Sequence, residues 1–225
     1  MNTRILTGAL ALAFVAGGTW FLTRPAPATT DPVLGAAMAQ EVDEAAVAEI
    51  EIEDMVLGNP DAEVEVIEYA SFTCPHCGNF HANQWKDLKA NYVDTGKIRF
   101  VYREVYFDRP GLWGSMLARC GDSTERFFGI ADMIYDQQRE LFGSGDPNAM
   151  VQGLRTIGLQ SGLDAEAVDA CLTDVTKAQA LVSWYEQNAT EDGVRSTPSF
   201  VIDGELYSNM SYEDFAAILD EKLGE

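Results

Sequence analysis

Two cysteines separated by two residues stand where the sequence changes from a strand pattern to a helix pattern. Residues Val64 to Ala70 (VEVIEYA) are mostly apolar and β-branched or aromatic, which is typical of a buried strand. The apolar positions that follow have a helical period: Cys77, His81, Trp85, Leu88 and Tyr92. The sequence therefore predicts an α/β structure in which Cys74-Pro75-His76-Cys77 opens a helix shortly after a buried strand.

The residues of this motif suit thiol chemistry. Cys74 lies at the expected helix N-terminus, where free N–H groups and the helix dipole favour a thiolate and lower the pKa of its thiol. Pro75 suits the first helical turn because it has no N–H to lose, and His76 can donate a hydrogen bond to the sulfur or carry a positive charge. Cys77 begins the apolar stripe, so we expect it to be buried and to resolve a mixed disulfide.

A stabilised thiolate favours the reduced form, so these features make a Cys74–Cys77 disulfide a stronger oxidant. The motif therefore favours a disulfide donor over a reductant. Two other interpretations remain: half of a zinc site, with His81 or another cysteine as a further ligand, or a purely structural disulfide. The chain has no second C-x-x-C motif, which argues against zinc. A structural disulfide would rarely enclose Pro-His at a strand-to-helix junction.

The charge of the chain excludes one class of partner. With 15 basic residues against 36 acidic ones, the net charge is −21, so the protein would repel a phosphate backbone and we expect no nucleic-acid partner. Two histidines are too few for a His-rich metal site, and we expect neither a metal nor another cofactor. Hydrophobic residues make up 47% of the 225 residues, as in one globular domain or two small ones.

The N-terminus predicts export from the cytoplasm. Residues 5–23 carry no charge and lie between two arginines, as in an export signal. Residues 1–24 are either a cleaved signal peptide, with Ala37-Met38-Ala39 as a candidate cleavage site, or a membrane anchor. Residues 25–46, rich in Pro, Ala and acidic side chains, are expected to form a linker. Both alternatives place the rest of the chain in an oxidising compartment, the periplasm, either as a soluble protein or tethered to the inner membrane.

After residue 46, strand patterns occur near the two ends of the remaining chain. They cover residues 50–55, 64–70, 98–105 and 199–202, and Asp203-Gly204 predicts a hairpin turn after the last of these. The expected order of elements is β-β-α-β, then a helical block, then β-β-α.

Helical patterns fill the middle of the chain. The helix that begins at the cysteines is expected to end at Gly96, and residues 111–192 show helical stretches only. Breaks are expected near Gly121, at 143–147 and at 158–162. N-caps are expected at Asp164 and Ser211.

Two segments carry a family resemblance. Val66 to Phe80 (VIEYASFTCPHCGNF) resembles the DsbA family of thioredoxin-fold thiol oxidases, and Ser196 to Phe200 (STPSF) is similar to that family's cis-proline loop. The resemblance covers residues 46–225. It implies a thioredoxin-like domain made of residues 47–110 and 181–225, with a helical domain inserted at 111–180.

The resemblance assigns roles to the loop before the last strands. In this family the residue before the proline, here Thr197, faces the dithiol, and its backbone pairs with a bound peptide. Pro198 directly before a strand is also unusual by itself. A cis peptide bond in a tight turn explains it most simply, with an ordinary trans proline as the alternative.

Glu68 and His81 occupy two further positions of interest. Glu68 matches the acid beneath the family's active site. In a buried strand Glu68 can pass a proton to or from Cys77, whereas on an exposed strand it would only face solvent. Some family members carry an acid four residues after the second cysteine, where this chain has His81. His81 is expected to be a packed core residue, and the sequence gives no support for a role in tuning the dithiol.

Cys120 and Cys171 lie in the helical block, 51 positions apart. An oxidising compartment favours a structural disulfide between them, which a subset of DsbA-like proteins also carries. The alternative is two separate buried thiols.

The resemblance implies a thiol–disulfide oxidoreductase that passes a disulfide from Cys74–Cys77 to exported proteins. A quinone-linked membrane oxidase like DsbB would re-oxidise it, and we expect a monomer. One alternative is an isomerase or reductase of the same fold, although such isomerases usually add an N-terminal dimerisation domain. The other is a non-catalytic module that binds a peptide or a metal.

Overall fold

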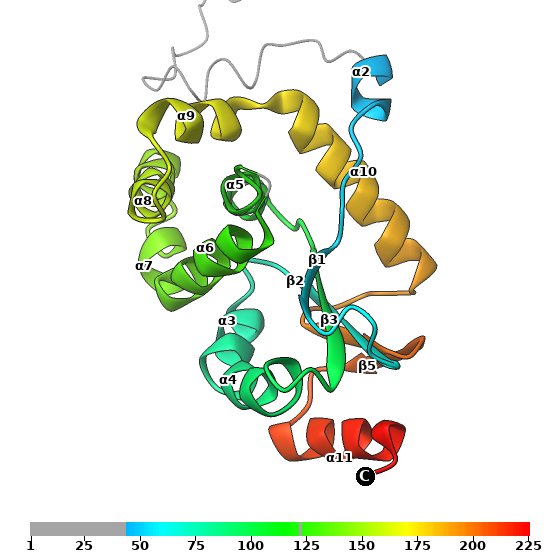
Figure 1. The fold of residues 1–225 in the computed structure, drawn as a ribbon. Helices are drawn as coiled ribbons and strands as arrows, with labels where there is room; N and C mark the ends of the chain where they lie inside the picture. The colour runs from blue at the N-terminus through cyan, green and yellow to red at the C-terminus, as the bar shows by residue number, and fades with distance from the viewer. Residues whose placement is uncertain (1–43, 122) are drawn as a thin grey trace, which may run out of the picture.

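The computed structural model describes residues 44–121 and 123–225, which form a mixed five-stranded sheet with helices on both faces (Figure 1). The strands are β1 (Met55–Gly58), β2 (Val64–Ala70), β3 (Ile98–Glu104), β4 (Ser199–Ile202) and β5 (Glu205–Ser208). Their order is β1-β3-β2-β4-β5; β2 and β3 are parallel, and the other neighbouring pairs are antiparallel. The strand that leads into the cysteine motif is therefore central.

The central strands follow the sequence pattern closely. β2 and β4 have the predicted bounds, and β3 ends one residue before the predicted end. Asp203 and Gly204 both have positive φ, +48° and +81°, as the hairpin turn between β4 and β5 requires. Because helices cover both faces of β2, all of its residues but Glu65 are buried, and apart from Glu68 the buried ones are apolar.

The first strand differs from the prediction. The alternating segment 50–55 was expected to be a strand, but β1 begins only at its last residue. Arg103 binds the Asp54 carboxylate with two hydrogen bonds of 2.8 and 3.0 Å, and Arg119 Nη1 donates to Glu53 O at 2.9 Å. The polar groups of this segment are thus held by arginines of the neighbouring elements and not by a strand ladder.

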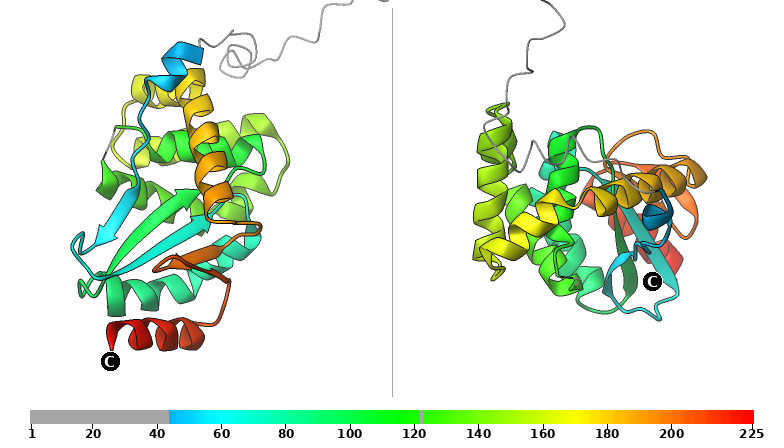
Figure 2. Two further views of the ribbon diagram at one scale, coloured as in Figure 1. Left: turned by 90° about the vertical axis from the view of Figure 1, so that its right-hand side faces the viewer. Right: turned by 90° about the horizontal axis from the view of Figure 1, so that it is seen from above.

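Helices cover the two faces of the sheet (Figure 2). One face carries α3 (Pro75–Ala82), α4 (Gln84–Leu88), a π-helical segment (Lys89–Val93) and α11 (Tyr212–Leu223). The other carries α10 (Val175–Glu191), where Ala189 joins a small apolar cluster with Ile67, Tyr69, Val101 and Val201. A short helix, α2 (Glu44–Ala48), precedes the sheet and lies against α10.

The helix after the cysteines is interrupted. A continuous helix to Gly96 was expected, but α3 ends at Ala82 and α4 begins at Gln84. Between them, Asn83 Nδ2 donates to Asn79 O at 2.8 Å. An asparagine side chain that binds a backbone carbonyl competes with the helical hydrogen bonds, which accounts for the break.

The helical block consists of α5 (Arg109–Ala118), α6 (Thr124–Asp136), α7 (Gln138–Phe142), α8 (Pro147–Gln160) and α9 (Ala165–Thr173). Asp164 caps α9 by accepting from the Ala167 N–H, and Ser211 caps α11, both as predicted. A break was expected at 158–162, but α8 continues to Gln160. A Cβ on Gly158 would lie 2.6 Å from Val168 Cγ2, so this glycine permits close helix packing.

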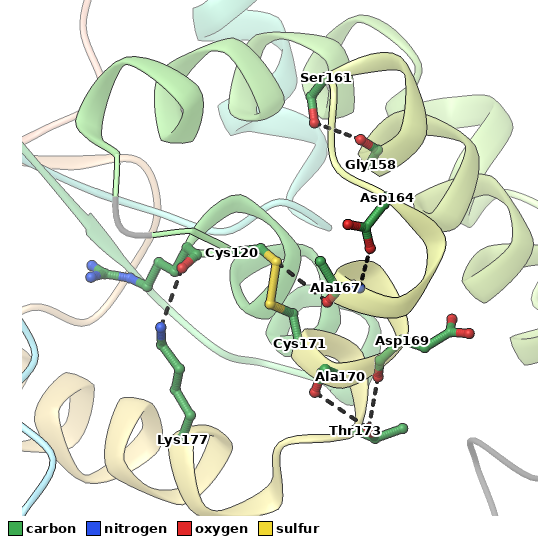
Figure 3. The surroundings of a disulfide bond; sticks show 11 residues. Cys120, Gly158, Ser161, Asp164, Ala167, Asp169, Ala170, Cys171, Thr173 and Lys177 are labelled. Atoms are coloured by element: carbon green, nitrogen blue, oxygen red, sulfur yellow. Dashed lines mark hydrogen bonds between the residues drawn. A yellow bond between two sulfur atoms is a disulfide. The ribbon is translucent and has the colours of Figure 1, made fainter.

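A disulfide joins Cys120, just after α5, to Cys171 in α9, with the two Cα atoms 5.8 Å apart (Figure 3). Nearby, Lys177 of α10 donates to the Arg119 carbonyl at 3.2 Å. The disulfide crosslinks the two ends of the block, and the Lys177 contact connects the block to α10, which returns to the sheet.

Some predictions concern residues that lie outside the described range or are not tested by the fold. The signal peptide or anchor at 1–24 and nearly all of the linker at 25–46 precede residue 44. No helix within 44–121 and 123–225 has the length and apolar character needed to cross a bilayer. The division of the chain at residues 110 and 180 remains a proposal, since α10 runs without interruption across the second boundary.

Candidate functional site

Cys74 is the N-cap of α3, and Pro75 is the first residue of the helix. The Cys74 N–H donates to Ser71 O, and the Gly78 N–H donates to Cys74 O, both at 3.1 Å. The loop therefore turns directly from β2 into α3 and leaves the Cys74 sulfur at the helix N-terminus. Neither Cys74 nor Cys77 is in a disulfide, so the structure shows the reduced pair.

The surroundings of Cys74 stabilise its thiolate. A hydrogen bond from the Cys77 thiol is the largest cause that lowers the pKa of Cys74, and burial acts in the opposite direction. Thr197 and the backbone N–H groups of Cys77 and His76 lower it further. Together they bring the pKa of Cys74 to about 5, so the group is a thiolate at neutral pH.

Cys77 has the opposite environment. Its side chain is completely buried, and burial is the main reason that its pKa is raised far above the usual value for a thiol. The hydrogen bond to Cys74 and the negative charges of Cys74 and Glu68 raise the pKa of Cys77 further. The pair therefore combines a largely buried thiolate at the helix N-terminus with a fully buried thiol that holds its proton.

His76 is exposed, and its backbone N–H is among the groups that lower the pKa of Cys74. The sequence also predicts a hydrogen bond or a positive charge from its ring, and that role of the side chain stays a prediction. The backbone contribution is the one expected of a helix N-terminus.

The loop before β4 meets the dithiol. The Thr197–Pro198 peptide bond is cis, and Cys74 Sγ lies 3.5 Å from Thr197 O. Tyr69 of β2 pairs with Ser199 of β4 in antiparallel register, so the end of β2 lies beside the start of β4. This register brings together two segments 123 residues apart.

Glu68 is fully buried in β2, on the strand face that packs against α3. Its Oε1 lies 3.1 Å from His81 Nε2, and its Oε2 has no hydrogen-bond partner among the described residues. The structure therefore places both residues in the core, as the sequence predicted for Glu68 in a buried strand and for His81. Their contact with each other was not predicted.

Gln138 is a residue of this site that the sequence did not identify. Its Nε2 donates to Phe72 O at 2.8 Å and to Cys74 O at 2.9 Å, from the first position of α7. No local pattern could reveal these contacts, because Gln138 lies 64 residues from Cys74 and its position depends on how the helical block docks. The helical block makes a second contact with the cysteine loop, where Thr73 Oγ1 donates to Asp108 at 3.2 Å.

A groove of about 640 Å³ lies beside the motif, between α3 and the ends of α6 and α7. Pro75 and Asn79 form one wall, and Gln138, Arg139 and Phe142 form the other. Within the described residues there is no cluster of three or more His, Cys, Asp or Glu side chains able to hold a metal ion.

Comparison with known proteins gives a consistent result. A family model described as Thioredoxin matches residues 51–221. A Rickettsia bellii protein with a provisional name as a protein-disulfide oxidoreductase is 34% identical over 176 residues, covering 78% of this chain and 67% of that protein. Disulfide bond formation protein D from Bacillus subtilis is 30% identical over 176 residues, covering 75% of this chain and 76% of that protein.

Solved structures agree in architecture. Alpha-DsbA1 from Wolbachia pipientis superposes with a TM-score of 0.67 at 26% sequence identity, covering 80% of this chain and 96% of that one. The expected fold, a thioredoxin fold with an inserted helical block, is confirmed. The chain spans 61% to 67% of the length of the first Rickettsia relatives that it matches.

Proposed function

The chain belongs to the DsbA family of thioredoxin-fold thiol–disulfide oxidoreductases, and we propose that Cys74 and Cys77 donate their disulfide to reduced proteins outside the cytoplasm. One observation carries the direction of transfer. The pKa of Cys74 is lowered to about 5 while that of Cys77 is raised, so the reduced pair is stabilised as one thiolate and one thiol. A stabilised reduced form makes the disulfide oxidising.

The first step is attack by a substrate thiolate on Cys74 Sγ of the oxidised pair. The Cys74–Cys77 bond breaks, Cys77 leaves with the bonding electrons and takes up a proton, and a mixed disulfide forms between the substrate and Cys74. The second substrate thiolate then attacks its own bridged sulfur. Cys74 leaves as a thiolate, the substrate is oxidised by two electrons, and the pair is reduced.

The low pKa of Cys74 assists the second step, because a thiol of lower pKa leaves faster. The raised pKa of Cys77 makes it a poor leaving group without a proton donor. Glu68 in its carboxylic-acid form is the proposed donor, since it is buried on the same side of the sheet as α3 and interacts electrostatically with Cys77.

Thr197 and Pro198 form the proposed substrate site. The Thr197 carbonyl lies next to Cys74 Sγ, so an extended peptide attached to Cys74 can pair with this loop through its backbone. Recognition through backbone groups would admit substrates of many sequences. Pro75 and the backbone N–H of His76 complete the proposed catalytic set at the helix N-terminus.

The cycle needs an oxidant to restore the disulfide. A quinone-linked membrane oxidase like DsbB is the proposed partner, and the periplasm is the proposed location. The export pattern of residues 5–23 and the oxidising compartment needed for Cys120–Cys171 support this location.

The function is tested by mixing the oxidised chain with a reduced two-cysteine peptide and following oxidation of the peptide by mass. We expect stoichiometric oxidation by the parent chain and none above background by Cys74→Ser. We expect reduced Cys77→Ser to form a lasting mixed disulfide with a peptide whose cysteine is activated, because no second thiol can resolve it. Activity that persists in Cys74→Ser would refute the site assignment.

An isomerase of the same fold is the second candidate. It would rearrange wrong disulfides in a scrambled substrate without net oxidation, and it would need the reduced pair. Assaying the reduced chain on scrambled ribonuclease, beside the oxidised chain on reduced ribonuclease, separates the two activities.

A further inference from the structure

Glu68 and His81 form a polar pair inside an aromatic core. His81 is 7% exposed and Glu68 is fully buried, and their facing atoms are 3.1 Å apart. The His81 ring stacks on Tyr135 with centroids 4.0 Å apart and an interplanar angle of 13°, and Trp85 lies 5.6 Å away. Burial of two polar side chains costs free energy even when they contact each other. The presence of this pair in the core near Cys77 therefore suggests a function.

Each member of the pair keeps one free atom. Glu68 Oε2 and His81 Nδ1 have no hydrogen-bond partner within the part of the chain that the structure describes. The imidazole ring can accept a proton at one nitrogen and release one at the other, and the carboxyl group can do the same between its two oxygens. The pair can therefore pass a proton from the Nδ1 side of His81 to the Oε2 side of Glu68.

A pocket of about 170 Å³ lies between His81 and the surface. Its walls come from α4, the π-helical segment and α6, and none of its lining residues belongs to the dithiol or to the Thr197–Pro198 loop. Exposed Lys86 and Asp136 stand at this pocket. The pocket borders the groove beside the cysteine motif at Tyr135 and Asp136 and reaches inward to His81, so solvent comes close to the histidine without passing the dithiol.

Charged and titratable groups face His81 from every neighbouring element. They are Cys77 on α3, Glu68 on β2, Tyr102 on β3, Lys86 on α4, Lys89 on the π-helical segment, and Asp132, Tyr135 and Asp136 on α6. A positive charge on His81 lowers the pKa of Asp132, whereas loss of hydration raises it. Two acidic side chains, Asp132 and Asp136, therefore line the pocket beside His81.

We infer that His81 is a positioning residue that connects Glu68 to solvent through this pocket, so that the proton taken up by Cys77 enters from behind the active site. The inference rests on the proposed function. When Cys77 leaves, Glu68 gives it a proton, His81 returns a proton to Glu68 through Nε2, and water in the pocket protonates His81 at Nδ1. One proton moves from solvent to Cys77, and re-oxidation of the pair reverses the path.

The test uses His81→Gln, which can still donate a hydrogen bond to Glu68 but cannot titrate. Quenched-flow alkylation measures how fast a dithiol peptide reduces the Cys74–Cys77 disulfide across a range of pH. We expect the rate to fall about tenfold or more, because general acid catalysis contributes at least that much. We also expect one ionisation to disappear from the pH profile, while the equilibrium redox potential stays unchanged.

Chemical rescue separates a proton path from a packing role. In His81→Ala, added imidazole should restore the rate with saturation, whereas the same imidazole should not rescue Glu68→Gln. The double variant Glu68→Gln/His81→Gln should be no slower than Glu68→Gln alone. A parental rate in His81→Gln, or a slow His81→Ala chain that imidazole does not rescue, would overturn the inference. A redox potential as reducing as that of thioredoxin would instead contradict the proposed function, in which the chain donates its disulfide.

Discussion

Cys74 and Cys77 are chemically unequal although they share one helical turn. The N-cap position gives Cys74 backbone donors, while full burial leaves Cys77 without hydration. The hydrogen bond between them acts on both, lowering the pKa of the acceptor and raising that of the donor. The division into an attacked sulfur and a resolving sulfur therefore follows from position on the helix.

The thiolate of Cys74 makes the stability of the reduced chain depend on pH. Its pKa in the folded chain is about 5, below the value of roughly 8.5 for a thiol in an unfolded chain. The resulting stabilisation is complete above about pH 8.5 and is lost as the pH falls through about 5. Below roughly pH 7.5 Cys77 is a thiol in both states, so its raised pKa does not act over most of this window.

Denaturant unfolding of both redox forms measures this effect. The free energy of unfolding of the reduced chain, minus that of the oxidised chain, should rise between about pH 5 and about pH 8.5. Carboxyl groups that titrate alike in both forms cancel in the difference. A flat difference, or one that falls with pH, would show that the folded chain does not favour the Cys74 thiolate.

At the scale of elements, the site depends on a contact between the helical block and the cysteine loop. Gln138 at the start of α7 binds the carbonyls of Phe72 and Cys74. Gln138→Ala should lower the free energy of unfolding by about 1–2 kcal/mol, since two partly buried carbonyls lose their donor. The loss should be the same in both redox forms, as measured by urea unfolding. The control is Gln152→Ala on the exposed side of α8, which should change the free energy of unfolding by no more than about 0.5 kcal/mol.

Two helical glycines provide a matched pair for the packing of the block. A Cβ on Gly158 would lie 2.6 Å from Val168 Cγ2 and 2.9 Å from Leu117 Cδ1, whereas a Cβ on Gly129 of α6 would have no neighbour within 4 Å. Gly158→Ala should destabilise the chain by about 1–3 kcal/mol through overpacking. Gly129→Ala should stabilise it by up to about 1 kcal/mol through helix propensity. Thermal unfolding of both variants checks the signs, and a stabilised Gly158→Ala chain would contradict this packing.

Elements could be predicted from sequence where a local pattern is decisive. β2 and β4 are buried on both faces, so their apolar runs give their bounds, and the caps at Asp164 and Ser211 are local as well. The segment 50–55 was misread because it alternates as a strand does, whereas the Asp54 carboxylate binds Arg103 and the Glu53 carbonyl binds Arg119. An alternating pattern shows which face of a segment is polar, but it does not show which groups bind the polar atoms.

For the whole molecule, the sheet order brings the site together. β2 lies between β3 and β4, and its antiparallel pairing with β4 sets the end of one beside the start of the other. The motif at Cys74 and Cys77 was visible in the sequence, and family resemblance connected it to Thr197 and Pro198. The contacts of Gln138 and of Glu68 with His81 could not be predicted, because they depend on the docking of separate elements.

The disulfide Cys120–Cys171 acts on the stability of the whole chain. It closes a loop of 51 residues, and the chain-entropy model gives an upper value of about 4 kcal/mol for such a crosslink. Cys120→Ala/Cys171→Ala should therefore lose up to about 4 kcal/mol in guanidinium unfolding. The same variant should oxidise the peptide at the parental rate at temperatures where it remains folded. A large loss of rate in the folded variant would show that this pair takes part in the redox chemistry.

The redox potential of the Cys74–Cys77 pair tests the central claim most directly. The chain is equilibrated with mixtures of reduced and oxidised glutathione, and the fraction of reduced pair is read by alkylation and mass, with Cys120→Ala/Cys171→Ala as the background. Stabilisation of the Cys74 thiolate predicts a potential clearly more oxidising than that of thioredoxin. A potential equal to that of thioredoxin, or more reducing, would contradict the account of a disulfide donor.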